Sequence, residues 1–271
     1  MTSTAFPEAD GRDLTQYQKD LKEHGFCIVP DVLPAQKCTS ALSTLWSAAE
    51  ESRRRGNPTH LPELDPNVFN VRVFYLMDLD PFFLDLIAHP TAIAMVQGFY
   101  QESSGGDFLI SNFTANIARP GSGSMGLHSD LSLQCPEPWI GERALNVIWC
   151  LTNATHANGS TLYIPNSHLW KTPSDVPPNA ESLLIPFEAP AGSVICMDGR
   201  LWHTSGKNVT KDEDRALLFG AYNAPWLRGQ VNWAAGLSEK SKEGLGEQLR
   251  GWLGVGVEGN MGKVKGVNRV Y

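Results

Sequence analysis

His128 and Asp130 are separated by a single residue, in the segment GLHSDLS. On an extended chain, residues i and i+2 point to the same side, so both side chains can address one point in space. Imidazole nitrogens and carboxylate oxygens are both common metal ligands. The pair is weak evidence by itself, because a hydrogen-bonded surface pair in a loop has the same spacing.

His203 closes the apolar run GSVICMDGRLW, far along the chain from His128. Two histidines and one carboxylate on one face of a metal, with the other positions open, form the facial triad of non-haem Fe(II) oxygenases. The open positions matter because they admit a chelating keto acid and then dioxygen beside a substrate. The competing interpretation of His203 is a hydrogen-bonded histidine at a strand edge.

Arg215 begins another β-like run, in the segment KDEDRALLFGAYN. A guanidinium matches a carboxylate through two parallel hydrogen bonds, so Arg215 could hold the distal carboxylate of 2-oxoglutarate. Because the run follows a turn, we expect it beside the strand of His203. The alternative is a surface ion pair with Asp212 or Asp214, which contributes little stability.

The composition is that of an ordinary globular protein, with 271 residues, 42% of them hydrophobic and 19% charged, and a formal net charge of -7. Lys and Arg are scattered, and no basic face with interleaved aromatics is visible, which argues against nucleic acid as a partner. No stretch approaches the ~18 apolar residues of a membrane span, and MTSTAFPEADGRD lacks a secretory h-region. The five cysteines form no CxxC pair. We therefore expect a cytoplasmic protein with reduced thiols and no membrane partner.

The first third of the chain has a helical pattern. Apolar residues recur at helical spacing over 14–21, and Gly25 follows as a stop signal. The short run GFCIVP then has β character. Pro34 opens a second predicted helix, and a third begins at Pro81 and breaks before Pro90.

From about residue 107 the pattern changes to short β-like runs separated by Gly, Pro, Asn and Asp clusters. They are DFLISNFTANIARP, ERALNVIWCLTNAT, STLYIPNSH, ESLLIPFEAP, GSVICMDGRLWHTSG and RALLFGAYNAPW. Short strands in such number, without βαβ alternation, predict a mainly β sandwich or barrel of jelly-roll type. Asn158-Gly159 is expected to form a two-residue hairpin turn. The tail from Leu237 is expected to hold one polar helix and then a Gly-rich loop.

Several stretches resemble one known family, the phytanoyl-CoA dioxygenase-like (PhyH) branch of the Fe(II)/2-oxoglutarate-dependent oxygenases. They are the opening YQKDLKEHGFCIVPDVLPAQKC, the blocks LHSDLSLQCPEPW and LNVIWCLTNATHANGSTLYIPNSHLWK, and the closing APAGSVICMDGRLWHTSGKN with the arginine that follows. Together they cover most of residues 15 to about 228. The phrases VRVFYLMDLDPFF and NGSTLYIPNSH are similar to members from fungal natural-product biosynthesis.

The resemblance implies a double-stranded β-helix (a cupin-like jelly roll) with flanking helices, in a single domain over 1–271. It implies an N-terminal helical part over about 1–105, a β-helix core over about 106–228, and a C-terminal helix and tail over 229–271. The residues that match the iron ligands are His128, Asp130 and His203. The residues that match the 2-oxoglutarate pocket are Arg215, Thr161, Trp149 and Ser205.

Two positions depart from the family pattern. Asn166 replaces the glycine of the PGSH phrase, at a turn where Asn tolerates similar backbone angles. Met125-Gly126-Leu127 stands before His128, where many members carry a Gln that contacts the cosubstrate. Asp130 itself argues against halogenation, because related halogenases lack this carboxylate so that chloride can bind iron.

The expected activity is therefore an Fe(II)/2-oxoglutarate-dependent dioxygenase reaction with O2 as cosubstrate. It would hydroxylate, desaturate or otherwise oxidise a C–H bond of a hydrophobic small molecule in secondary-metabolite biosynthesis. A CoA thioester is disfavoured, because this acidic chain shows no basic mouth for its phosphates. The candidate substrate residues are Arg72, Phe74, Met125, Leu133 and Trp226. A homodimer is one expectation, since the Gly-rich tail could reach over a neighbour's pocket.

Two other functions stay open. The same triad could hold zinc in an isomerase or hydrolase, although no Glu base accompanies the histidines and Arg215 would have no task. The chain could also be a non-catalytic β-helix protein that binds a ligand, although a scaffold has no need of the triad together with Arg215.

Overall fold

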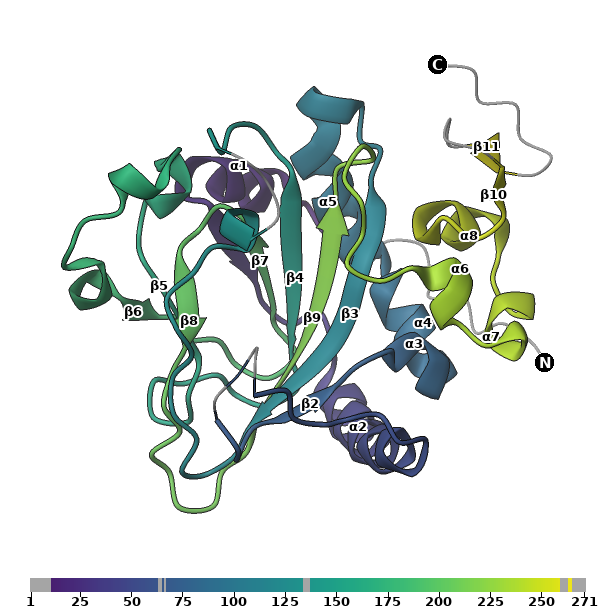
Figure 1. Ribbon diagram of the computed structural model, residues 1–271, viewed down its shortest axis with the longest axis horizontal. Coiled ribbons are helices and arrows are strands. Elements are labelled where there is room, and N and C mark those ends of the chain that lie inside the picture. Colours follow the sequence, from purple (N-terminus) through teal and green to yellow (C-terminus); the bar gives the residue numbers. More distant parts are fainter. Residues whose placement is uncertain (1–10, 63–64, 66, 134–136, 259–262, 265–271) are drawn as a thin grey trace.

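The computed structural model describes residues 11–62, 65, 67–133, 137–258 and 263–264. At its centre lie two antiparallel sheets, and helices pack on the outer face of the larger one (Figure 1). The architecture is thus mainly β with flanking helices, as the sequence predicts.

The larger sheet has six strands in the order β1-β7-β4-β9-β3-β2, and all neighbours are antiparallel. These strands are β1 (Phe26–Val29), β2 (Val71–Val73), β3 (Leu109–Ala118), β4 (Ala144–Cys150), β7 (Val194–Asp198) and β9 (Arg215–Asn223). The edge strands β1 and β2 come from the N-terminal part of the chain. The predicted helical part and the β core therefore share one sheet.

The smaller sheet has three strands in the order β6-β5-β8 and faces the larger sheet (Figure 1). Its strands are β5 (Thr161–Tyr163), β6 (Ile185–Pro186) and β8 (His203–Ser205). A compact hydrophobic cluster joins the two sheets, with Ile148 and Leu217 from the larger one and Tyr163 from the smaller one. This cluster holds the sheets together on one side of the space between them.

Strand β3 shows that the larger sheet has one apolar and one polar face. Phe113 and Ile117 belong to the main hydrophobic core with the helices. Asn112, Thr114 and Asn116 line a cavity between the sheets. The separation follows from the alternation of side chains along a strand.

The helices begin and end at the residues that the sequence marks. Their bounds are α1 (Thr15–His24), α2 (Ala35–Arg54), α3 (Leu76–Leu79), α4 (Pro81–Ile87) and α5 (Pro90–Ser104). Gly25 ends α1 with a left-handed φ of 79°. Pro34 directly precedes α2, and Asp80 caps α4 by accepting a hydrogen bond from the N–H of Phe82.

Within the described part of the chain, no single helix has the length and apolar character of a membrane span. The helices α4 and α5 meet the test only as a pair, bent by 40° at their junction. Their side chains Phe83, Met95 and Tyr100 are buried in the main core.

The expected hairpin at Asn158-Gly159 is wrong. The strands on either side, β4 and β5, belong to different sheets, so the chain crosses between sheets here instead of reversing within one. Gly159 still has a left-handed φ of +86°, and a Cβ there would lie 3.0 Å from the carbonyl oxygen of Gly206. Asn166 is also left-handed, with φ 63°, as its turn position predicts.

The C-terminal region packs on the same helical side of the molecule (Figure 1). It contains α6 (Trp233–Gly236), α7 (Glu239–Glu243), α8 (Glu247–Leu253), and the paired strands β10 (Val257–Glu258) and β11 (Lys263–Val264). Buried Trp233 donates its indole N–H to the carbonyl of Ile110 at 2.9 Å. The tail from Leu237 was expected to hold one polar helix and a Gly-rich loop, and its described residues instead form two short helices, α7 and α8, and a small strand pair.

Candidate metal centre

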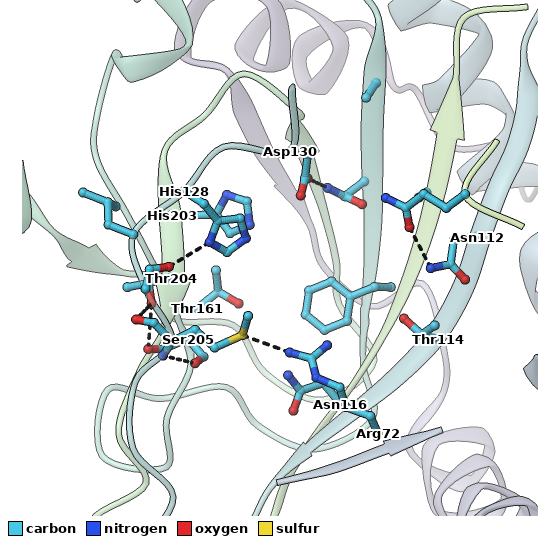
Figure 2. Close-up of a pocket in the computed structure, with 18 of the residues that line it drawn as sticks. Arg72, Asn112, Thr114, Asn116, His128, Asp130, Thr161, His203, Thr204 and Ser205 are labelled. Atoms are coloured by element: carbon cyan, nitrogen blue, oxygen red, sulfur yellow. Dashed lines mark hydrogen bonds between the residues drawn. The ribbon is translucent and has the colours of Figure 1, made fainter. Parts of the chain in front are cut away.

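Two histidines face each other across an isolated antiparallel bridge. His203 opens β8, and His128 precedes the short 3-10 helix η1 (Asp130–Leu133). The N–H of His128 donates to the carbonyl of His203 at 3.1 Å, and the reverse bond is 2.8 Å long. The ring centroids lie 4.5 Å apart. Two distant segments thereby bring two imidazoles to one edge of the cavity (Figure 2).

A backbone carbonyl fixes the orientation of each imidazole. Nδ1 of His128 lies 2.8 Å from the carbonyl oxygen of Gly126, and Nδ1 of His203 lies 2.9 Å from that of Leu201. A carbonyl oxygen only accepts, so each Nδ1 carries the hydrogen and each Nε2 keeps its lone pair. Metal-binding histidines are commonly held in this way. Burial lowers the pKa of His203, which favours the neutral imidazole that a metal needs.

Asp130 completes the group from the first turn of η1. Its Oδ2 accepts a hydrogen bond from the amide of Asn146 on β4, which leaves Oδ1 without a partner among the described residues (Figure 2). One ligand atom from each of Asp130, His128 and His203 lies within 4.8 Å of the others. Two imidazoles and a carboxylate on one side of a point suit Fe(II) or Zn(II).

The three side chains open into a cavity of about 500 Å³ between the two sheets. Its walls come from β2, β3, β4 and β9 of the larger sheet, from β5 and β8 of the smaller sheet, and from residues 125–128. Cavities of this size hold small organic molecules in other proteins. The space is sufficient for a keto acid and part of a substrate.

Arg215 lies in the wall of this cavity at the start of β9, with only 1% of its surface exposed. Its Nε donates to the carbonyl of Gly159 at 3.0 Å, and Nη1 donates to that of Asn116 at 3.2 Å. Nη2 has no hydrogen-bond partner among the described residues. The alternative of a surface ion pair with Asp212 or Asp214 is wrong, because Arg215 is buried and forms no ion pair among the described residues, and Asp214 lies instead 3.6 Å from Arg119.

Arg215 forms no ion pair in the described part of the structure, although the charge of buried Asp65, which pairs with Arg72, acts on it from a longer distance. Burial, together with the nearby charge of Arg72, lowers the pKa of Arg215 to about 10. The group is still protonated at neutral pH. A buried guanidinium without a counter-ion is costly unless an anion pairs with it, so this end of the cavity suits a carboxylate.

Thr161 and Ser205 face each other on β5 and β8, and both line the cavity. The hydroxyl of Ser205 accepts a hydrogen bond from the N–H of Met125 at 3.0 Å. The neighbouring Thr204 donates its hydroxyl to the carbonyl of Met125 at 2.7 Å. These bonds tie the segment before His128 to β8 and so help to position the triad.

Two predicted site residues lie outside the cavity wall, and the side chain of a third is not among those that the structure describes. Trp149 belongs to the main core on the opposite face of β4, with its ring 5.3 Å from His89, so its assignment to the cosubstrate pocket is wrong. Trp149 lies three positions after Asn146, and because side chains alternate along a strand the two residues face opposite sides of the sheet. Trp226 is 59% exposed beyond β9, so its assignment to the substrate pocket is also wrong. Leu133 ends η1, and its side chain lies outside the described residues.

The other predicted substrate residues, Arg72, Phe74 and Met125, do line the cavity. Arg72 forms an ion pair with buried Asp65 at 3.2 Å. Its Nη2 also lies 2.9 Å from the sulfur of Met125. The ion pair and the sulfur contact hold this guanidinium at the rim of the cavity (Figure 2).

Sequence reasoning missed the amide side chains of the cavity wall. They are Asn112, Asn116, Asn146, Asn223 and Gln230. A signal was present in β3, where polar residues occupy every second position of an otherwise apolar strand, and in β4, where Asn146 interrupts LNVIW. A polar residue at a buried strand position requires a partner, and it therefore marks a site.

The comparisons with known proteins agree with this geometry. A sequence profile of the phytanoyl-CoA dioxygenase (PhyH) family matches residues 21–216. Dioxygenase af480 of Aspergillus fumigatus is 51% identical over 243 residues, which are 88% of this chain and 77% of the relative. The iron/alpha-ketoglutarate-dependent dioxygenase ausU of Aspergillus calidoustus is 29% identical over 113 residues, 40% of this chain and 37% of that protein.

A solved structure shares the fold. It is the epimerase SnoN in complex with Fe3+, alpha ketoglutarate and nogalamycin RO, with a TM-score of 0.64, 17% identity, and coverage of 80% of this chain and 86% of SnoN. This likeness confirms the predicted jelly roll. Given the family match and the relative at 51% identity, the chain belongs to the phytanoyl-CoA dioxygenase family and is an enzyme of the dioxygenase class.

Proposed function

We propose that the chain uses Fe(II) and 2-oxoglutarate to oxidise a C–H bond of a small molecule, with His128, Asp130 and His203 as the iron ligands. The main support is the pair of hydrogen bonds from the two Nδ1 atoms to backbone carbonyls, which leaves both Nε2 lone pairs for a metal. When bound, iron and 2-oxoglutarate supply the oxidation of the substrate by dioxygen, with succinate and carbon dioxide as coproducts.

Arg215 has the task of binding the distal carboxylate of 2-oxoglutarate. Its Nε and Nη1 are held by backbone carbonyls, which fixes the plane of the guanidinium before the ligand arrives. Folding has already removed this charge from water, so an incoming carboxylate gains a strong electrostatic interaction without further desolvation of the guanidinium. Thr161 and Ser205 lie close to this end of the cavity and add hydroxyl groups to the cosubstrate site.

Asn146 positions Asp130. Its amide N–H occupies Oδ2 of the carboxylate, so Asp130 would present a single oxygen to the metal. A carboxylate that bound through both oxygens would use a coordination position needed by the keto acid or dioxygen. Asn146 is buried on a central strand, and this makes the orientation rigid.

The pathway assignment rests on the relatives. The similar proteins named above include two from Aspergillus species and one from nogalamycin biosynthesis. We propose the same setting, secondary-metabolite biosynthesis, with hydroxylation as the default outcome. A zinc-dependent hydrolase is disfavoured, because it gives the buried charge of Arg215 no ligand.

The test is the conversion of 2-oxoglutarate to succinate by the purified protein, followed by NMR. We expect slow succinate formation with Fe(II) and oxygen in the absence of substrate, and none with Zn(II). His203→Ala should abolish it, whereas His156→Ala, a change at an exposed residue that does not line the cavity, should not. Turnover that proceeds equally with Zn(II) or without oxygen would contradict the proposed function.

A further inference from the structure

One part of the cavity wall is lined by side-chain amides. Asn112 on β3 and Asn223 on β9 line it together with Gln230, which follows β9. Asn112 donates to the side-chain oxygen of Gln230 at 2.9 Å (Figure 2). We call these three residues the amide wall.

Two buried oxygen atoms of the amide wall, Oδ1 of Asn112 and Oδ1 of Asn223, accept no hydrogen bond from any residue that the structure describes. The amide of Asn223 is oriented by its Nδ2 donating to the carbonyl of Arg228 at 3.4 Å, and the residue is only 1% exposed. A buried acceptor without a donor is destabilising, so the site is shaped for a ligand that donates.

The sheet register separates this wall from the Arg215 end of the cavity. Asn223 lies eight residues after Arg215 on β9, which is roughly 26 Å along an extended strand. The keto acid, which must reach from the triad to Arg215, therefore leaves the amide wall uncovered.

The same register places the amide wall close to the triad. Asn112 and Asn146 both pair with Ala221, one from each side. Because neighbouring strands are about 4.8 Å apart, Asn112 lies about 10 Å from the residue that holds Asp130. A small molecule can touch the amide wall and still present a C–H bond to the metal.

We infer that the substrate is a small molecule with hydroxyl or N–H groups, which donate to Oδ1 of Asn112 and Oδ1 of Asn223. Its apolar part would lie against Phe74, Phe219 and Ala221, which line the same cavity. The inference rests on the proposed function and refines the expectation of a hydrophobic substrate, because a plain hydrocarbon would leave both acceptors unpaired.

The test uses two probes that differ only in a donor, 4-fluorophenol and 4-fluoroanisole. The protein is loaded with Mn(II) and 2-oxoglutarate, and 19F NMR line broadening reports binding near the paramagnetic metal. We expect 4-fluorophenol to broaden and to bind about tenfold more tightly than the ether, the effect of one net hydrogen bond. Asn223→Leu and Asn112→Leu should each remove this preference, and Asn179→Leu, an exposed change, should leave it intact.

Equal binding of the two probes, no binding of either, or a preference that survives in both variants would overturn the inference. If Asn223→Leu does not fold, the binding of the two probes is compared between the wild type and Asn112→Leu, a change at a half-buried residue. Failure of the proposed function has a different signature, since the wild type would then form no succinate from 2-oxoglutarate with Fe(II) and oxygen. In that case, chemical-shift changes would be used to measure binding of the two probes. Loss of the preference for 4-fluorophenol in the leucine variants would still support the role of the amide wall.

Discussion

The two faces of the six-stranded sheet differ in the polarity of the side chains that they bury. The face toward the helices is apolar, with Phe113 of β3 and Trp149 of β4 in the main core. The face toward the smaller sheet places Asn116 and Asn146 in the wall of the cavity that buried Arg215 also lines. The first face is explained by packing alone. The second buries polar atoms that have no partner among the described residues, such as Oδ1 of Asn116, which a fold tolerates where a ligand supplies the partner.

The largest expected effect comes from a substitution in the apolar core on the helix-facing side of the sheet. Phe113→Ala should lower the free energy of unfolding by about 3–5 kcal/mol, because it removes a fully buried ring from a packed core. Urea unfolding measures this loss. The folded fraction should bind Mn(II) with unchanged affinity, and a large loss of metal affinity would show that the two faces are not separable.

The inward face is tested at Arg215. Arg215→Leu should weaken 2-oxoglutarate binding about 100-fold, since it removes a desolvated charge that pairs with a carboxylate. Calorimetric titration of the metal-loaded protein gives the affinity. The affinity of Arg215→Lys for 2-oxoglutarate should fall between those of the wild type and Arg215→Leu, because an ammonium keeps the charge but loses the two-point contact. Wild-type affinity in Arg215→Leu would remove this residue from the cosubstrate site.

Asn146 sharpens the comparison within one strand. Asn146→Ala should weaken metal binding about 10- to 100-fold, as is typical when a group that orients a ligand is lost. The matched change on the other face, Val147→Ala, should cost stability and leave metal binding unaltered. Mn(II) EPR titrations distinguish the two. Equal effects of both changes on metal affinity would contradict a positioning role for Asn146.

A smaller effect is expected from pH. Burial lowers the pKa of His203 below its ordinary value of about 6.5. The folded state thus binds fewer protons than the unfolded state, so stability is full above about pH 6.5 and falls as the pH drops toward the lowered pKa. Urea unfolding of the metal-free protein between about pH 5 and 7.5 should show this decline. His203→Gln should flatten it, and an unchanged slope would assign the titration elsewhere.

The helical part and the jelly roll could be predicted because local signals and burial agree there. Gly25, Pro34 and Pro90 mark helix boundaries, and alternating apolar residues mark the strands. Trp149 was misassigned because likeness of sequence does not show which face of a strand a residue occupies. That face is set by the register with β7 and β9.

The triad could also be predicted, because its three ligand types sit at a recognisable spacing. The amide wall could not be predicted, because only the pairing of β3 with β9 brings Asn112 and Asn223 to the same part of the cavity. The prediction of a hairpin at Asn158-Gly159 was wrong for a similar reason. Its local chemistry is that of a turn, but which strands it joins depends on the sheets.

The most direct measurement is anaerobic addition of Fe(II) and 2-oxoglutarate to the purified protein, with the visible spectrum recorded. A weak charge-transfer band should develop in the wild type, because His128, Asp130 and His203 leave room for the keto acid to chelate the metal. The band should be absent in His203→Ala and should need far more 2-oxoglutarate in Arg215→Leu. Identical spectra and titrations in all three proteins would contradict the account.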